Sequence, residues 1–207
     1  MLALAEKMRD KDKTVAYRAA KALGKLGPPA GPLLLEALRD ENSWTQHVAS
    51  EALSKMEEPP IGELCDLLAD KNGGIRFAAA RTLQQMGPKA EEAIPTYLEL
   101  LQGKDRDMRA EAIEGLGRIG PDASVAIPTL CEILQDKKSG SRCRSRAAIA
   151  LGRMGASARV AIPVLEAALK EENTHLPKYA ARALKSIKSA PGAPSGRPTP
   201  KRSPGTG

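Results

Sequence analysis

The sequence predicts an all-α fold, a right-handed solenoid of about six stacked helix pairs. A short motif, Ala-Leu-Gly with close variants, returns along the chain at a near-constant step, and its leucines are Leu23, Leu53, Leu83, Leu116, Leu151 and Leu184. A repeat of this length is typical of stacked supersecondary units. Apolar residues are 42% of the chain but aromatic residues only 2%, so aliphatic side chains must supply the core. Such side chains pack well between helices.

The second helix of each unit is predicted from the columns around the central leucine. Alanine stands four residues before the leucine in every copy, and a leucine, isoleucine or methionine stands three residues after it. These offsets lie on one face of an α-helix. Alanine at this place lets neighbouring helices approach closely. Glycine follows the last apolar position, where we expect left-handed C-caps, at Gly27, Gly87, Gly120 and Gly155.

The first helix of each unit is predicted from a second recurring segment, clearest as AIPTYLELL, AIPTLCEIL and AIPVLEAAL. Its prolines, Pro95, Pro128 and Pro163, fall in the first helical turn, where no backbone hydrogen bond is lost.

A polar turn is predicted between the two helices of each unit. Asp10, Asp40 and Asp70 stand thirty residues apart in it, and we expect them to cap the helix that follows. A column of arginines comes later, and we expect these to tie adjacent turns to one another through turn carboxylates: Arg76, Arg109 and Arg144.

Counting a first and a second helix per unit gives predicted units at about residues 1–27, 28–57, 58–87, 88–120, 121–155 and 156–190. Residues 191–207, PGAPSGRPTPKRSPGTG, are rich in proline and glycine and carry only basic charges. We expect this segment to be a disordered tail.

The helix pairs resemble HEAT repeats. The residues that carry the resemblance are a first helix such as AIPTLCEIL, a turn of the form D-x-x-x-x-x-R and a second helix such as MRAEAIEGLGRIG. The likeness is to short bacterial repeats of the phycobilisome-lyase type, and it extends over about residues 2–189. It implies an armadillo-like superhelix whose second helices line the concave face. The matched residues are mostly packing residues, so the resemblance says more about fold than about activity.

Charge and cysteine content narrow the classes of function. The net charge is +7, and Arg197, Lys201 and Arg202 supply three of these charges, which leaves about +4 on the repeats. An excess this modest does not by itself indicate nucleic-acid binding. The three cysteines have no paired spacing and are expected to be small hydrophobic residues. The sequence has no signal peptide and no membrane-spanning run, so we expect a soluble, cytoplasmic protein with no membrane partner.

Catalytic and metal-binding motifs are missing from the sequence. His47 and His175 are far apart and neither is followed by glutamate, so the His-Glu pairs of HEAT-type deoxyhypusine hydroxylases are not matched. No glycine-rich phosphate loop follows a strand pattern. We therefore expect no enzymatic activity, no cofactor and no metal.

Candidate binding residues come from columns where the repeats stop agreeing. The columns five before, two before and two after each leucine are expected to be exposed, and the column six before carries Tyr17, His47 and Phe77. Flat side chains beside basic residues could hold an extended peptide with hydrophobic and acidic groups. Alternatively, each ring covers the neighbouring helix. The predicted partner-binding residues are Tyr17, Arg18, Lys21, His47, Phe77, Arg81, Arg118, Arg146 and Arg153.

The leading hypothesis is a non-enzymatic scaffold or adaptor that binds a protein or peptide on its concave face. The resemblance implies one alternative, a phycobilin lyase-type subunit for chromophore attachment. A second alternative is nucleic-acid binding through the basic concave residues, which the acidic residues Glu51, Glu111 and Glu114 disfavour because they interrupt the basic stripe.

Overall fold

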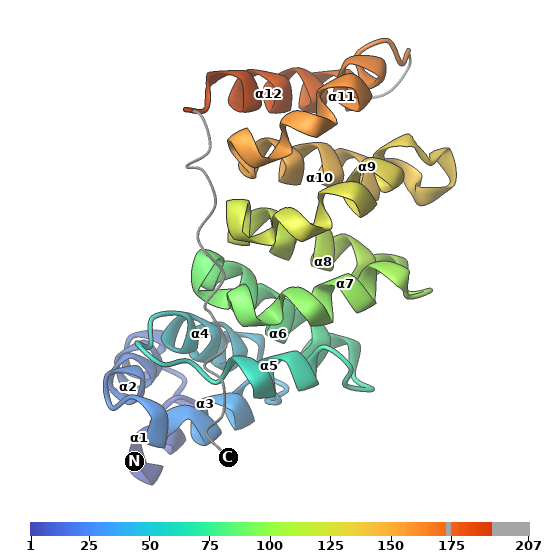
Figure 1. Ribbon diagram of the computed structural model, residues 1–207. Helices are drawn as coiled ribbons and strands as arrows, with labels where there is room; N and C mark the ends of the chain where they lie inside the picture. The colour runs from blue at the N-terminus through green and yellow to red at the C-terminus, as the bar shows by residue number, and fades with distance from the viewer. Residues whose placement is uncertain (173–174, 192–207) are drawn as a thin grey trace, which may run out of the picture.

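The computed structural model describes residues 1–172 and 175–191, and this part of the chain is mostly helical, with short turns between the helices. Twelve α-helices and five short 3₁₀ helices follow one another, with no strand in the described ranges. They stack into one continuous array, with α1 at one end and α12 at the other (Figure 1). The predicted all-α solenoid is therefore confirmed. The predicted disordered tail lies, apart from Pro191, outside the described residues.

The helices alternate between two layers of the stack. The first helices, some opened by a 3₁₀ turn, are α1 (Leu2–Lys7), α3 (Gly31–Ala37), α5 (Ile61–Leu67), α7 (Ile94–Gln102), α9 (Ile127–Gln135) and α11 (Ile162–Ala168). The second helices are α2 (Lys13–Lys25), α4 (Ser43–Ser54), α6 (Gly73–Met86), α8 (Arg106–Ile119), α10 (Gly140–Arg153) and α12 (Leu176–Ser189). The 3₁₀ helices are η1 (Pro28–Ala30), η2 (Gly87–Ala93), η3 (Gly120–Ala126), η4 (Lys137–Ser139) and η5 (Gly155–Ala161).

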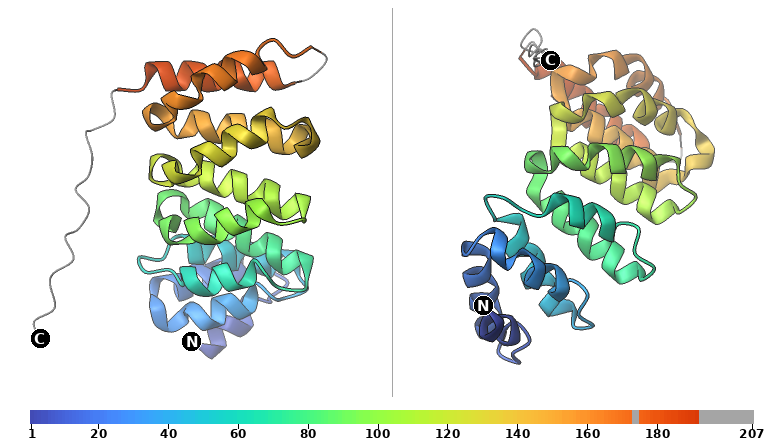
Figure 2. Two further views of the ribbon diagram at one scale, coloured as in Figure 1. Left: turned by 45° about the vertical axis from the view of Figure 1, so that its right-hand side comes forward. Right: turned by 60° about the horizontal axis from the view of Figure 1, so that its bottom comes forward.

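The second helices form the inner layer of a curved stack. Each one packs closely on the second helix of the next unit, whereas neighbouring first helices touch one another much less. The layer with the closer spacing lies on the inside of the curve, because the inner arc is the shorter one. Figure 2 shows this curvature from two further directions.

The core follows the columns predicted around the central leucine. All six alanines four residues before a leucine are buried, and so are the six leucines themselves. Burial of this aliphatic stripe in every unit supplies the main stabilising term, at about 25 cal/mol for each Å² of apolar surface removed from water.

The glycine and alanine on either side of the leucine set how closely the second helices approach. A Cβ atom on Gly117 would lie 2.8 Å from the Ala150 Cα, and one on Gly152 would lie 2.8 Å from the Ala183 Cα. In both junctions the glycine after one central leucine meets the alanine before the next. The recurring Ala-Leu-Gly motif is therefore a contact between units as well as a feature of one helix.

The aspartate column does not cap the second helices, so that prediction was wrong. The caps stand two residues later, where the side chains of Asp12, Asn42 and Asn72 accept hydrogen bonds from the second amide of each helix. Asp10, Asp40 and Asp70 instead accept from the amides of these capping residues, and so shape the turn just before the helix. A side-chain acceptor for an unpaired helix amide is what fixes these helix starts.

The arginine column binds mainly backbone carbonyl groups at the ends of first helices. Arg76 donates to the carbonyl oxygen of Asp70 at 3.0 Å, and Arg109 donates to that of Gly103 at 2.9 Å. Arg144 donates to the Leu134 carbonyl at 2.8 Å. These arginines satisfy carbonyls that have no partner within their own helix, which ties the two helices of one unit together.

Ion pairs between successive units come from other residues in the turns. Arg9 reaches Asp40 of the next unit at 2.6 Å, and Arg39 repeats the contact with Asp70 at 2.9 Å. The prediction that arginines tie adjacent turns is confirmed for two members of the predicted column. Arg76 pairs with Asp105 at 3.3 Å, and Arg144 pairs with Glu171 in the turn of the next unit.

The predicted helix ends are confirmed at the glycines and prolines. Gly27, Gly87, Gly120 and Gly155 all have positive φ, for example 84° with ψ −135° at Gly120, a conformation that side chains with a Cβ rarely adopt. Pro95, Pro128 and Pro163 stand in the first turn of α7, α9 and α11.

The cysteines and the helix lengths complete the description of the scaffold. None of the three cysteines is disulfide-bonded, and Cys143 is buried while Cys65 and Cys131 are half-buried. Burial raises the pKa of all three thiols. Among the described residues, no helix combines the length and the apolar character needed to cross a bilayer.

Candidate functional site

The candidate site is the surface formed by the second helices, which we call the second-helix face. Three hollows lie on it. One lies between α2 and α4, a second lies between α6 and α8 and is lined by Phe77, Arg81 and Arg118 among others, and a third lies along α10 and reaches α12. Together they extend over all six second helices. This face can therefore accept a long, extended partner.

The structure places the predicted binding residues on this face but exposes them unequally. Arg18, Lys21, Arg81, Arg118 and Arg153 are exposed. Three others are half-buried, namely Tyr17, His47 and Arg146. Phe77 is 41% exposed, which is unusual for a large apolar side chain and leaves much of its ring available for contact.

The aromatic column in the first three units is linked by contacts between units. The Tyr17 hydroxyl donates to Glu51 Oε1 at 3.2 Å. The ring of His47 lies 5.2 Å from that of Trp44, and Arg81 Nη2 lies 3.4 Å from His47 Nδ1. Tyr17 and His47 thus serve packing as well as exposing an edge, whereas Phe77 contributes an open ring.

Trp44 is a site residue that the column analysis missed. It lies outside the column of Tyr17, His47 and Phe77, but it packs on His47, and Lys13 Nζ stands 5.0 Å from its ring centre. A cation over an indole face is a favourable contact. One feature of the sequence could have drawn attention to it: Trp44 is the only tryptophan of the chain.

Three of the predicted arginines are held by carboxylates of α8. Arg118 and Arg153 both donate to Glu114 Oε1, at 2.9 and 2.8 Å, so that Glu114 joins α8 to α10. Burial works to raise the pKa of Glu114, but the hydrogen bonds from Arg153 and Arg118 outweigh it and lower that pKa. These two guanidinium groups therefore have part of their charge neutralised within the protein.

Glu111 is a second carboxylate on α8 that binds several side chains. It is buried, although the column five residues before the leucine was predicted to be exposed. Glu111 is only 8% exposed. Gln84 from α6 donates to its Oε2 at 2.8 Å, and Arg142 and Arg146 from α10 donate to its Oε1 at 2.9 and 3.0 Å. Glu111 thus connects three second helices.

The column five residues before the leucine is not uniformly exposed, contrary to the prediction. Val48 and Glu111 are buried, while Arg18 in the same column is exposed. The reason is the stacking itself, because the second helix of the next unit covers this column wherever a following unit packs closely. Arg146 shows the contact directly, since its Nη1 donates to the Ala110 carbonyl at 2.6 Å.

The cations of α2 are not paired in this way. Within residues 1–172 and 175–191, no carboxylate lies within ion-pair distance of Arg18, Lys21 or Lys25. Lys55 on α4 is instead paired with Glu51 of its own helix, which raises the pKa of Lys55 and lowers that of Glu51. Among the described residues, Arg81 on α6 and Lys178 and Arg182 on α12 likewise have no carboxylate within that distance, so unpaired cations lie at both ends of the face.

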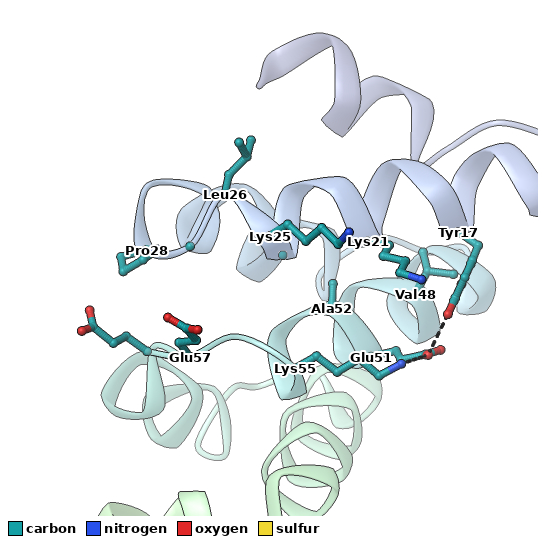
Figure 3. Close-up of a pocket in the computed structure, with 13 residues that line it drawn as sticks. Tyr17, Lys21, Lys25, Leu26, Pro28, Val48, Glu51, Ala52, Lys55 and Glu57 are labelled. Carbon is teal, nitrogen blue, oxygen red and sulfur yellow. Dashed lines mark hydrogen bonds and ion pairs between the residues drawn. The ribbon is translucent and has the colours of Figure 1, made fainter.

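The hollow between α2 and α4, which we call the α2–α4 cleft, has a volume of about 640 Å³. Lys21 and Lys25 extend along its α2 side, and Glu57 lies across from Pro28 (Figure 3). Its lining comprises Tyr17, Lys21, Gly24, Lys25, Leu26, Gly27, Pro28, Val48, Glu51, Ala52, Lys55, Glu57 and Glu58. The floor is thus apolar and the rim is charged.

The described residues form no metal-ligating cluster. None of their histidine, cysteine, aspartate and glutamate side chains come together in groups of three or more that could hold a metal ion.

Several solved structures share this architecture. An archaeal HEAT-like repeats protein from Thermococcus onnurineus NA1 is 18% identical with a TM-score of 0.59, covering 92% of this chain and 81% of that one. The complex of CpcE and CpcF of phycocyanin lyase from Nostoc sp. PCC7120 contains a chain that is 26% identical with a TM-score of 0.54, covering 89% of this chain and 75% of that one. Computationally designed armadillo repeat proteins for modular peptide recognition match at 16% identity and a TM-score of 0.53, covering 89% of this chain and 98% of that one.

Sequence comparison identifies the family. Comparison with the curated proteins finds no relative of this chain. The sequence profile described as HEAT repeats, however, matches three times, over residues 1–61, 61–152 and 94–185, which together span most of the chain. The predicted resemblance is thereby confirmed, and the chain belongs to the HEAT-repeat family.

Proposed function

We propose that this protein is a non-enzymatic scaffold or adaptor that binds a protein or peptide along its second-helix face. The observation that carries the proposal is the series of hollows that extends from α2 to α12 on one face. A long face with an exposed aromatic ring at Phe77 and free cations at Arg18 and Lys21 suits an extended chain with apolar and acidic side chains. The likeness to armadillo repeat proteins designed for peptide recognition supports the same proposal.

The test is a selection of short linear peptides from a displayed library on the full chain. We expect enriched peptides to lose about tenfold or more in affinity when Tyr17, Phe77 and Arg81 are replaced by alanine together. A matched control replaces three exposed side chains outside the three hollows, Val125, Val160 and Lys170, by alanine. Failure to enrich any peptide, or equal binding to both triple variants, would contradict the proposal.

A second candidate function is that of a phycobilin lyase-type subunit in chromophore attachment. The observation that favours it is the 26% identity to a chain of the phycocyanin lyase complex, over 89% of this protein. It predicts that the protein gains visible absorbance when incubated with a bilin. A protein that stays colourless at bilin excess would count against it.

Nucleic-acid binding is less well supported. Arg146 and Arg153 are held by Glu111 and Glu114, so a nucleic acid would have to compete with these carboxylates. Among the described residues, the unpaired cations lie mainly on α2 and α12, and the paired arginines of α8 and α10 stand between them, so they do not form a continuous phosphate-binding stripe.

A further inference from the structure

The α2–α4 cleft lies at a junction where a glycine of one second helix meets an alanine of the next, and such junctions recur on the second-helix face. A Cβ atom on Gly24 would lie 3.1 Å from the Ala52 carbonyl oxygen, so α2 and α4 also approach closely along their backbones. The same Gly-Ala pairing occurs between α8 and α10, at Gly117 and Ala150. With Gly152 and Ala183 between α10 and α12, there are three such Gly-Ala junctions, and in each the contact is made by small residues alone.

Side chains cross the later junctions. Between α8 and α10, Arg153 reaches over to Glu114, which also holds Arg118. Between α10 and α12, the Ser186 hydroxyl donates to the Gly152 carbonyl oxygen at 2.7 Å. At the α2–α4 junction, Tyr17 bonds Glu51 at one end only, and Glu51 is otherwise occupied by Lys55 of its own helix.

Within the part of the chain that the structure describes, Lys21 and Lys25 have no acidic partner, and they stand beside an open apolar floor. Leu26, which lines the same cleft, is 50% exposed and adds an apolar wall. An aliphatic side chain placed on this floor would remove apolar surface of both partners from water.

The charges around the cleft are separated rather than uniform. Its lining holds three lysines and three glutamates, so its formal net charge is zero. Lys55 and Glu51 neutralise each other. This leaves Lys21 and Lys25 on the α2 side and Glu57 and Glu58 in the segment after α4, and among the described residues no ion pair joins the two groups (Figure 3).

From this arrangement we propose that the α2–α4 cleft binds a peptide segment in which an aliphatic side chain is flanked by acidic residues on one side and basic residues on the other. The aliphatic side chain rests on Gly24 and Ala52, the acidic residues face Lys21 and Lys25, and the basic residues face Glu57 and Glu58. The inference rests on the proposed function, because it assigns a partner class to one subsite of the same face. A uniformly acidic or uniformly basic peptide would meet one repulsive group, which is how separated charges discriminate between partners.

The test uses three capped hexapeptides and NMR titration of the full chain, followed at the backbone amides of α2 and α4. The peptides are Asp-Asp-Leu-Leu-Lys-Lys, Asp-Asp-Leu-Leu-Asp-Asp and Lys-Lys-Leu-Leu-Lys-Lys. We expect the mixed peptide to bind the wild-type protein about fivefold more tightly than either uniform peptide, and to shift the amides of Gly24 and Ala52.

Charge reversal should exchange the preferences. Replacing Lys21 and Lys25 by glutamate makes the unpaired charges of the cleft all negative, so this variant should prefer the basic peptide. Replacing Glu57 and Glu58 by lysine makes them all positive, so that variant should prefer the acidic peptide. All four side chains are exposed, so both double variants should keep the unfolding midpoint of the wild type.

A matched control carries the same change of charge outside the cleft, with Lys71 and Lys104 replaced by glutamate, and it should keep the wild-type order of preference. The inference is overturned if the mixed peptide shifts no amide of α2 or α4, or if both reversed variants keep the wild-type preference. Library peptides that still bind and still depend on Tyr17, Phe77 and Arg81 would then leave the proposed function standing. If binding of the library peptides did not depend on Tyr17, Phe77 and Arg81, that separate result would contradict the proposed function.

Discussion

Two junctions of the second-helix face, α2–α4 and α8–α10, use the same Gly-Ala contact with opposite results. At the α2–α4 junction, Gly24 and Ala52 form a floor that stays open, with free lysines above it. At the α8–α10 junction, Gly117 and Ala150 form an even closer contact that Arg153 and Glu114 cross. The comparison teaches that the repeat motif fixes how closely helices approach, while residues two positions from the leucine decide whether the junction is open or bridged.

The partly buried pair between Arg144 and Glu171 is expected to give the largest effect, and it tests how strongly the last two units are joined. The Arg144 side chain is 9% exposed, it donates to both carboxylate oxygens of Glu171, and it also binds the Leu134 carbonyl. Arg144→Met leaves the carboxylate and the carbonyl without this partner, so we expect a loss of about 3 kcal/mol in the free energy of unfolding. Urea denaturation measures it, with Arg182→Met as the control, at an exposed arginine of α12 that has no ion pair among the described residues.

The same pair predicts a dependence on pH. The hydrogen bond from Arg144 lowers the pKa of Glu171 below its ordinary value of about 4.3. A carboxyl group with a lowered pKa stabilises the fold above its unfolded pKa and loses that contribution as pH falls through its folded pKa. The difference in unfolding free energy between wild type and Arg144→Met should therefore be full at pH 7 and shrink below about pH 4. A difference that stays constant down to pH 3 would contradict this account.

Replacing the glycines tests the close approach at these two junctions directly. A methyl group at residue 117 would lie 2.8 Å from both the Cα and the Cβ of Ala150, and backbone cannot move aside cheaply. We expect Gly117→Ala to cost about 2 kcal/mol, because overpacking outweighs the better helix propensity of alanine. At residue 24 the nearest contact is 3.1 Å, so Gly24→Ala should come close to neutral. Equal losses of unfolding free energy for the two variants in urea denaturation would show that the α2–α4 and α8–α10 junctions do not differ in how closely their helices approach.

Glu114 bridges α8 and α10 through Arg153, and removing its charge should make the α8–α10 junction resemble the α2–α4 junction. Glu114→Gln keeps the size of the side chain but releases the charges of Arg118 and Arg153. We expect a loss of about 1 kcal/mol in stability, together with tighter binding to a single-stranded oligothymidylate at low salt. Glu132→Gln, which removes an exposed carboxylate on α9, is the control for net charge. If both variants bind the oligonucleotide equally, the released arginines are not the cause.

The smallest effect on stability is expected at the open junction. Lys21 and Lys25 have no ion pair in the described ranges, so replacing both by alanine should leave the unfolding midpoint in urea unchanged. Replacing the two paired cations of the bridged junction, Arg118 and Arg153, together by alanine should lower that midpoint. A clear loss for the lysine variant would mean that these side chains have a structural partner.

Much of the fold could be predicted from particular columns of the sequence. Ala112 and Leu116 repeat at helical spacing and are buried, and Gly120 ends its helix with positive φ, all as expected. The capping residues were misassigned, because Asp40 and Asn42 are both good acceptors near the helix start and only the backbone geometry distinguishes them.

The candidate site could be predicted less completely. The columns predicted that Phe77, Arg81 and Lys21 lie on the surface of the second helices, as they do, but they did not show that Arg118, Arg146 and Arg153 would be held by Glu114 and Glu111. They also missed Trp44 and the burial of Val48. Each of these depends on which side chains from units more than thirty residues apart meet across a junction.

The sequence by itself determined the helical stack, the places where helices end and the small residues at which they touch, because these features depend on spacing and conformation within a few residues of the chain. The tertiary structure alone decided which charges are paired, which part of each column is covered and which Gly-Ala junction stays open. These depend on the curvature of the stack and on the reach of long side chains between units, where a difference of one or two ångströms separates an ion pair from a free charge.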